Sequence, residues 1–308
     1  MQRNPLGRRS RIGAVLAVGA LTLAACGNDA DPETDDTDQT DDTDQSSRVS
    51  DPDDDQSPDD GVELLAGGDE EKFELAPVYQ VGQQATMDMD INVDMAIDFS
   101  GQSQDIGLSM NIALTSQVVK ATEAGSTVEM TVDEIDVDSP AGGEEEMLAE
   151  MEPLIGETLV TEYDENGNQV GATTVKGGAD LPESLAESFE TATAAAFPSE
   201  AVGIGSRWSS VVESSSGGID LDITTVYELT EVTDDEIVID VSQEVPVDQE
   251  IEGAQMSGTL NGSGELRVAR DNPLVMDVEY DQQAEFSFEQ EGDSGDMDMS
   301  IDIIVDSE

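Results

Sequence analysis

Residues 87–99 read MDMDINVDMAIDF, and the strict alternation of their side chains decides the fold of this chain. Every odd position from Met87 to Phe99 is apolar, whereas the even positions hold four aspartates, one asparagine and one alanine. Successive side chains of a strand point to opposite faces, and a helix would scatter this pattern around its circumference. The stretch therefore predicts a long strand with one apolar and one acidic face.

The same alternation predicts strands along most of the chain. A polar turn at 100–105 leads into a strand at Ile106–Leu114, and the alternation then slips near Ser116–Val119 and again before Ile135, as β-bulges would cause. Later strands are predicted at Trp208–Val212, Leu221–Leu229, Ile237–Val241, Met256–Leu260, Glu265–Ala269, Met276–Tyr280, Ala284–Phe288 and Met297–Val305. We expect an all-β dominated fold with minor α, in which long antiparallel strands form a curved sheet or half-barrel.

The middle of the chain departs from this alternation. Glu144–Met151 predicts a short helix that ends before Pro153. Leu159–Tyr163 and Val170–Val175 flank Asn166-Gly167, a strong signal for a β-hairpin. Pro182–Phe197 predicts a second helix, because proline is tolerated in a first helical turn and an apolar stripe follows it.

The N-terminus has the pattern of an export signal. A basic start precedes an apolar run of 14 residues, Ile12–Ala25, which is shorter than the roughly 20 residues a bilayer span requires. The run ends in Leu23, Ala24, Ala25 and Cys26, which resembles the bacterial lipobox. That resemblance implies a lipoprotein with a diacylglyceryl and palmitate-modified Cys26, anchored on the extracytoplasmic face of the cell membrane. The alternative is an ordinary cleaved signal with a chance cysteine, but Cys26 is the chain's single cysteine.

Three regions follow from these patterns: a signal peptide at 1–25, an acidic disordered tether at 26–62 and a β-rich domain at 63–308. The tether repeats TDDTDQ over Thr34–Gln45 and has too few apolar residues to offset chain entropy. Within the domain, Val81-Gly82 and Ile204-Gly205 each open a run of strands. We interpret about 73–178 and 198–308 as a duplicated meander, although any two meanders share much of this pattern.

Composition excludes several classes of function. The chain has no histidine and one cysteine, which removes Ser-His-Asp and Cys-His nucleophiles, the usual zinc sites and disulfides. It has 72 acidic against 11 basic residues, a balance that repels nucleic acid and anionic lipid headgroups. Asp88 and Asp90 are about 7 Å apart on one strand face, as in carboxylate hydrolases, but Asp94 and Asp98 continue the same acidic stripe. We expect neither catalysis nor a metal nor a cofactor.

The remaining hypotheses concern the apolar side of the strands. Methionine is unbranched and adaptable, and proteins use it where an apolar surface must accept varied shapes. We expect an apolar ligand face that would bind a lipid or another apolar small molecule, and it consists of Met87, Met89, Ile91, Val93, Met95 and Met110. The alternative is a structural or protein-interaction lipoprotein of the cell envelope, in which these residues fill a closed core and no small ligand binds.

A succession of short motifs carries a further resemblance. The motifs are Tyr79-x-x-Gly82, the Met/Asp strand, Pro153-Leu154-Ile155-Gly156, the Asn-Gly hairpin, the Leu-rich helix, Phe197-Pro198 and Gly205-x-x-Trp208. This order resembles a family of bacterial lipoproteins catalogued as a domain of unknown function, over about residues 73–308. More distantly, the pattern is similar to the half-barrels of lipoprotein carriers and lipid-binding lipoproteins. The resemblance implies architecture and location, and no functional residues are carried over from it.

Overall fold

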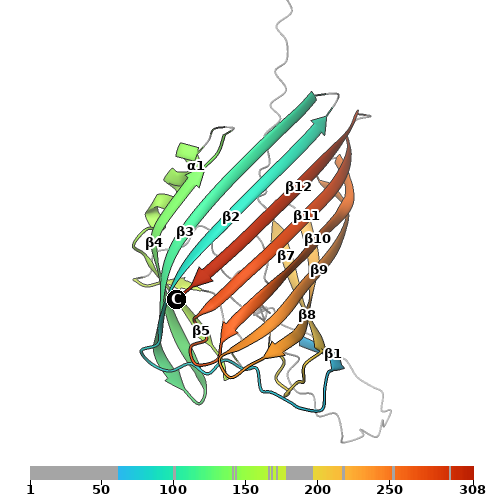
Figure 1. The fold of residues 1–308 in the computed structure, drawn as a ribbon. Helices are drawn as coiled ribbons and strands as arrows, with labels where there is room; N and C mark the ends of the chain where they lie inside the picture. Colours follow the sequence, from blue (N-terminus) through green and yellow to red (C-terminus); the bar gives the residue numbers. More distant parts are fainter. Residues whose placement is uncertain are drawn as a thin grey trace, which may run out of the picture.

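A computed structural model of the chain describes residues 62–308 except 100–101, 141, 143, 166, 168, 171–172, 178–196, 217–218, 252–253 and 291–292. Within these residues the backbone forms one antiparallel sheet of 12 strands with one short α-helix in the middle of the chain (Figure 1). The expected all-β dominated fold with minor α is confirmed. The predicted tether before residue 62 and, apart from Phe197, the predicted helix Pro182–Phe197 lie outside the described residues.

The strands lie across the sheet in the order β1-β7-β8-β9-β10-β11-β12-β2-β3-β4-β5-β6. Their bounds are β1 Val62–Gly67, β2 Gln84–Phe99, β3 Gln102–Thr122, β4 Gly125–Asp138, β5 Thr158–Tyr163, β6 Thr174–Val175, β7 Ser206–Ser216, β8 Ile219–Val232, β9 Glu236–Ile251, β10 Ala254–Ala269, β11 Met276–Gln290 and β12 Asp293–Ser307. The α-helix α1 spans Glu144–Met151 and continues as a 3-10 turn, Glu152–Leu154. No helix in the described ranges is long and apolar enough to cross a membrane.

Two meanders meet where the last strand pairs with β2. Strands β2 to β6 are neighbours in chain order, and so are β7 to β12. At the seam between them, Ile303 of β12 lies opposite Ile91 of β2. Gly82 and Gly205 adopt positive φ values of 93° and 80° just before β2 and β7, so both meanders begin after a similar turn. Their origin by duplication stays a prediction.

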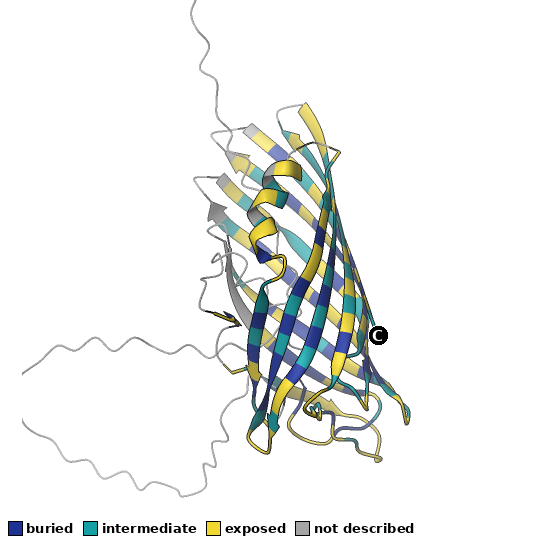
Figure 2. Cartoon of the chain, turned by 90° about the vertical axis from the view of Figure 1, so that its left-hand side faces the viewer, coloured by how far each residue is buried: buried dark blue, intermediate teal, exposed yellow. Residues whose placement is uncertain are grey.

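The alternation in the sequence appears as two faces of a curved sheet (Figures 1 and 2). On β2 the side chains of Asp88, Asp90, Asp94 and Asp98 are exposed on the outer face, whereas Val93 is buried on the concave face. The register of β3 with β4 shifts around Val118 and again around Ala113, which confirms both predicted bulges. Such bulges add twist and help a long sheet to curve.

Several predicted strands are shorter than the observed ones, because polar residues at inward positions resemble turn residues. Met256–Leu260 and Glu265–Ala269 are parts of one strand, β10, and Met276–Tyr280 and Ala284–Phe288 are parts of one strand, β11. The backbone ladder between β10 and β11 continues without interruption through these polar stretches. A ladder needs only main-chain groups, so the missing apolar side chains do not end it.

Other differences concern the inner strand β9 and the elements at the two edges of the sheet. Strand β9 runs to Ile251, ten residues beyond the predicted end at Val241, and β1 was not predicted at all. Of the predicted strand Val170–Val175, the described residues Thr174–Val175 form β6, and Gln169 just before it forms an isolated bridge with Tyr163. The helix at Glu144–Met151 is confirmed with its predicted bounds. Edge elements have few partners, and so the sequence pattern specifies them weakly.

Candidate functional site

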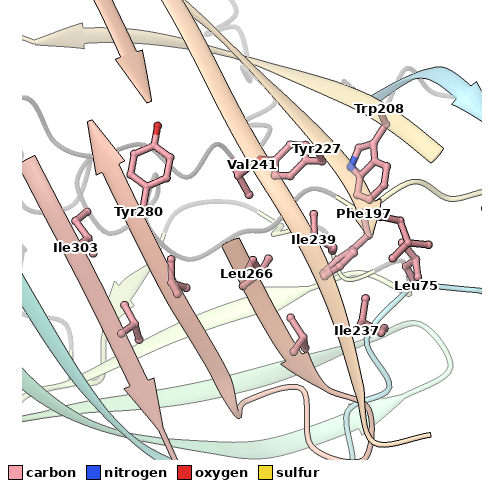
Figure 3. Close-up of a cluster of buried hydrophobic side chains, with 14 of the residues drawn as sticks. Leu75, Phe197, Trp208, Tyr227, Ile237, Ile239, Val241, Leu266, Tyr280 and Ile303 are labelled. Carbon is pink, nitrogen blue, oxygen red and sulfur yellow. The ribbon is translucent and has the colours of Figure 1, made fainter. Parts of the chain in front are cut away.

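One end of the concave face is a sealed apolar core, which we call the closed base. It consists of Trp208, Tyr227, Leu229, Ile239 and Leu266, from β7 to β10, and each is at most 2% exposed. The Trp208 and Tyr227 rings stack with their centroids 5.7 Å apart. Leu75 and Phe197, from segments outside the sheet, pack against this cluster (Figure 3). The closed base therefore leaves no apolar surface for a ligand.

The predicted ligand face, here called the Met-lined face, has a different accessibility. The structure brings its members together on β2 and β3: Ile91 lies opposite Met110, and Met95 lies opposite Ile106 on β3 and Met299 on β12. Only Val93 is buried, at 7% exposed, and the others are half-buried: Met87, Met89, Ile91, Met95 and Met110. Their role as a ligand face stays a prediction.

The Met-lined face also connects two parts of the core. Met87 and Met89 pack against the cluster that contains the closed base. The same two side chains pack against a second cluster, which contains Leu114, Val132 and Leu159 of β3, β4 and β5. Helix α1 contributes Leu148 and Met151 to that second cluster (Figure 1). The face is thus a half-open apolar strip between two packed regions.

A row of polar side chains crosses the concave face next to these apolar regions. Backbone register places four polar residues on neighbouring inward positions, with Gly262 of β10 between the third and the fourth. They form what we call the polar row: Ser210 of β7, Thr225 of β8, Gln243 of β9 and Gln282 of β11. Their exposed fractions are 0%, 1%, 6% and 6%.

The sequence pattern did not predict the polar row, although each member is a polar residue at an inward position of its strand. Gln243 interrupts the inward series Ile239, Val241, Val245 and Val247 of β9. Such an interruption is visible in the sequence, but it reads as the end of a strand. Only the pairing register shows that the interruptions of several strands line up.

Hydrogen bonds hold one end of the polar row. The Tyr280 hydroxyl on β11 donates to Gln243 Oε1 on β9 at 2.8 Å, and Gln282 Nε2 donates to the same oxygen at 3.3 Å. Tyr280 reaches across β10 because that strand has glycine at position 262, where a Cβ would overlap the tyrosine hydroxyl. Burial, and secondarily the neighbouring Tyr227, raises the pKa of Tyr280, so the phenol remains a proton donor.

The other end of the row has unused hydrogen-bonding capacity. In the described part of the chain, Ser210 Oγ, Thr225 Oγ1 and Gln243 Nε2 are buried without a hydrogen-bond partner. Because Gln243 Oε1 accepts from Tyr280 and Gln282, its Nε2 is left as a free donor. Buried polar groups are nearly always paired, so three neighbouring exceptions mark this position as unusual.

The outer face carries charged side chains, whereas the concave face is lined by apolar and neutral polar side chains. Behind the Met-lined face, Asp302 of β12 lies directly opposite Asp281 of β11. A hydrogen bond with Asp281, then burial, then the charges of Asp281 and Asp94 raise the pKa of Asp302. Behind the closed base, Arg267 pairs with Glu265 at 2.6 Å and with Glu236 at 3.7 Å.

The outer face has a shallow groove and acidic side chains that are paired or solvent-exposed. This groove of about 300 Å³ is lined by Arg207, Glu228, Asp240, Ser242 and Ser263 among others. Burial, then Glu265 and Glu228, raises the pKa of Asp240. Within the described ranges, no cluster of acidic side chains has the geometry to hold a metal ion. Asp90, one of the paired acids considered above, accepts a hydrogen bond from Asn111 at 2.9 Å on this outer face.

The predicted lipidation site is not part of the described structure. Cys26 and the lipobox residues Leu23, Ala24 and Ala25 all precede residue 62. Their assignment stays a prediction from the sequence.

Comparison with known proteins gives one family match. Residues 181–272 match the model of a family described as "Family of unknown function (DUF6263)". The match covers less of the chain than the expected 73–308, and it includes strands β7 to β10. No curated protein matches the chain.

Among solved structures, the chain is similar to the translocator domain of the autotransporter NalP from Neisseria meningitidis. The two share 7% sequence identity, with 73% of this chain and 89% of that chain covered and a TM-score of 0.18. At that TM-score nothing about this chain follows from the similarity. The comparisons therefore identify a DUF6263 family domain at residues 181–272 of a β-rich chain.

Proposed function

We propose that this chain is a membrane-anchored extracytoplasmic lipoprotein that binds the acyl chain of a lipid along its concave face. The observation that carries the proposal is the contrast in burial between the Met-lined face and the closed base. A core that served only stability would bury both to the same extent, since each half-buried methionine forgoes part of its hydrophobic stabilisation. Five of the six residues of the Met-lined face are nevertheless half-buried.

The dimensions of the Met-lined face support an extended ligand. Met87 and Met95 are eight residues apart on β2, which corresponds to roughly 26 Å along a strand. One leaflet of a bilayer has a hydrocarbon layer of about 15 Å, half of the usual core thickness. The face is therefore long enough to hold one extended acyl chain.

The acidic outer face supports anchoring by lipid rather than by surface charge. Carboxylates on β2, β11 and β12 repel the anionic headgroups of a membrane surface. A diacylated Cys26 would supply two chains, which is the number that stable anchoring requires. The anchor is tested by Cys26→Ser with metabolic labelling by a palmitate analogue, and labelling that persists in this variant would exclude Cys26 as the lipid site.

A binding role is also favoured over catalysis by where the charged groups lie. The acids that could act as a pair are on the outer face, whereas the concave face that would hold a substrate is lined by apolar and neutral polar side chains. General acid–base chemistry requires a titrating group within hydrogen-bond reach of the substrate. We therefore propose that the chain carries or presents its ligand unchanged.

A fluorescently labelled fatty-acid methyl ester, which is uncharged, tests the binding proposal directly. The full chain carrying Cys26→Ser is suited to this, because it has no acyl anchor that would require detergent. We expect saturable binding, and we expect Ile91→Asp to abolish it by placing a carboxylate in the path of the acyl chain. The control is Ile304→Asp on the outer face, where isoleucine is already 42% exposed, and binding should survive.

Two outcomes would favour the alternative, a structural lipoprotein without a small ligand. One is the absence of saturable binding by the chain with an intact concave face. The other is equal loss of binding in Ile91→Asp and Ile304→Asp, because the probe would then respond to charge or to folding and not to the Met-lined face.

A further inference from the structure

The polar row has the chemistry of a site for one uncharged hydrogen-bond acceptor. Ser210 and Thr225 each have a hydroxyl that can donate, and Gln243 Nε2 is an amide donor. The three residues occupy adjacent inward positions of β7, β8 and β9, where neighbouring Cβ atoms are about 5 Å apart. Three neighbouring groups that can donate, none of which has a hydrogen-bond partner among the described residues, suit an oxygen that the protein itself does not supply.

The charge of the surroundings decides which oxygen fits. The row contains no cation, and its neighbour Tyr280 is kept protonated by burial. The chain as a whole has a formal charge of −61. A carboxylate or phosphate buried there would lack a counter-charge and would be opposed by the field of the protein. A neutral carbonyl oxygen needs only the hydrogen bonds that the row offers.

We propose that the polar row binds the ester carbonyl of an uncharged acyl ester whose chain lies on the Met-lined face. This inference rests on the proposed function and adds the class of lipid to it. Register connects the row to the face, because Gln282 lies opposite Ile301 and Ile301 lies opposite Val93. Ile301 is 0% exposed and Val93 is 7% exposed, so entry of the ester from the half-buried methionines requires these side chains to move.

The unpaired buried hydroxyls should then lower the stability of the ligand-free protein by a measurable amount. A buried hydroxyl without a partner destabilises a protein, and replacing it by a methyl group of similar shape relieves that cost. Thr225→Val should therefore leave the melting temperature of the free protein unchanged or higher. Thr161→Val is the matched control, because Thr161 is equally buried but shares a 3.0 Å hydrogen bond with Thr173, and its loss should lower the melting temperature.

A matched pair of ligands tests the recognition itself. Monooleoylglycerol and its oleyl ether analogue have the same chain and headgroup, and they differ only in the ester carbonyl. Each competes with the fluorescent methyl ester for the full chain carrying Cys26→Ser. We expect the ester to bind roughly three- to tenfold more tightly than the ether, which corresponds to one or two neutral hydrogen bonds. Thr225→Val should reduce this preference, because it removes one of the three donors, while the affinity for the ether is kept.

The outcomes separate the two proposals. Equal binding of ester and ether would overturn the carbonyl site and leave the acyl-binding proposal standing. An undiminished preference in Thr225→Val would also overturn it. A fall in melting temperature in Thr225→Val as large as in Thr161→Val would show that the hydroxyl is satisfied in the free protein, for instance by buried water, and would overturn the site too. Binding of neither lipid, together with no binding of the fluorescent methyl ester, would overturn the proposed function itself.

Discussion

The closed base and the Met-lined face belong to the same sheet and the same apolar surface, yet they are packed differently. At the base, aromatic and branched side chains from β7 to β10 are sealed by Leu75 and Phe197. Along β2 and β3, unbranched methionines alternate with isoleucine and valine and remain half-buried. Hydrophobic alternation alone therefore identifies the buried side of a sheet but not how completely that side is covered.

The outer side of the sheet repeats the contrast. Behind the base, Arg207 and Arg267 are paired with glutamates. Behind the Met-lined face, Asp302 lies against Asp281 with Asp94 close by. The closed base therefore has complete burial on its concave face and ion pairs on its outer face. The Met-lined part of the sheet has incomplete burial on its concave face and neighbouring carboxylates on its outer face. A region that must admit a ligand is expected at the low end of local stability.

The largest predicted effect compares the same substitution in the two regions. Ile239→Asp places a carboxylate in the closed base, where no counter-ion or water reaches it, and should prevent folding at a cost of several kcal/mol. Ile91→Asp meets a half-buried site and should fold, with a melting temperature lower by a few degrees. Circular dichroism melts of the two variants decide this. Unfolding of both would mean that the Met-lined face is closed core as well.

A smaller effect is expected at the border between the regions. Gly262→Ala would drive a Cβ into the Tyr280 hydroxyl and break its bond to Gln243. Overpacking of this kind should lower the free energy of unfolding by about 1–3 kcal/mol. Gly107→Ala is the control, because its nearest neighbour, Asp94 Oδ1, would lie at an ordinary 3.5 Å. Equal stability of the two variants in denaturant titrations would contradict the role given to Tyr280.

The smallest effect concerns the acid pair behind the Met-lined face. The pKa of Asp302 is raised in the folded state, so ionisation of this side chain destabilises the fold at neutral pH. That cost disappears as the pH falls below 3.8, the ordinary pKa of an aspartate. Asp302→Asn should raise the melting temperature by about 1–3 °C at pH 7. The difference should shrink toward pH 4.

The reciprocal variant checks that this effect belongs to the pair. Asp281→Asn removes the other carboxylate and should give a similar rise at pH 7, with little further gain in the double variant. A gain that does not change with pH, or that is fully additive, would mean that the two carboxylates do not interact.

The sequence predicted the strands well where alternation is strict and poorly where it is interrupted. Met87–Phe99 defines β2 because every odd residue is apolar, and Glu144–Met151 defines α1 because Pro153 limits it. Gln243 and Gln282 are inward residues that look like turn residues, so β9 and β11 were predicted too short. Local pattern contains no information about a partner strand distant in sequence.

The candidate site shows the same limit. The members of the Met-lined face could be chosen from the sequence because they share one strand and its nearest neighbour. Ser210, Thr225 and Gln243 come together only through the register of three strands, and each is unremarkable alone. Coverage of the apolar face depends on tertiary packing, which no single strand encodes.

Methionine oxidation tests the central claim, which is that the Met-lined face is accessible to an apolar ligand while the packed core is not. The full chain carrying Cys26→Ser is treated briefly with peroxide, and sulfoxide formation at each methionine is followed by mass spectrometry, with and without saturating monooleoylglycerol. Met89 and Met95 are half-buried and should oxidise faster than Met130, which is buried in the second cluster. The lipid should slow oxidation at Met89 and Met95 and leave Met130 unchanged. Oxidation of all three at the same slow rate, or no protection by a lipid that binds, would contradict this account.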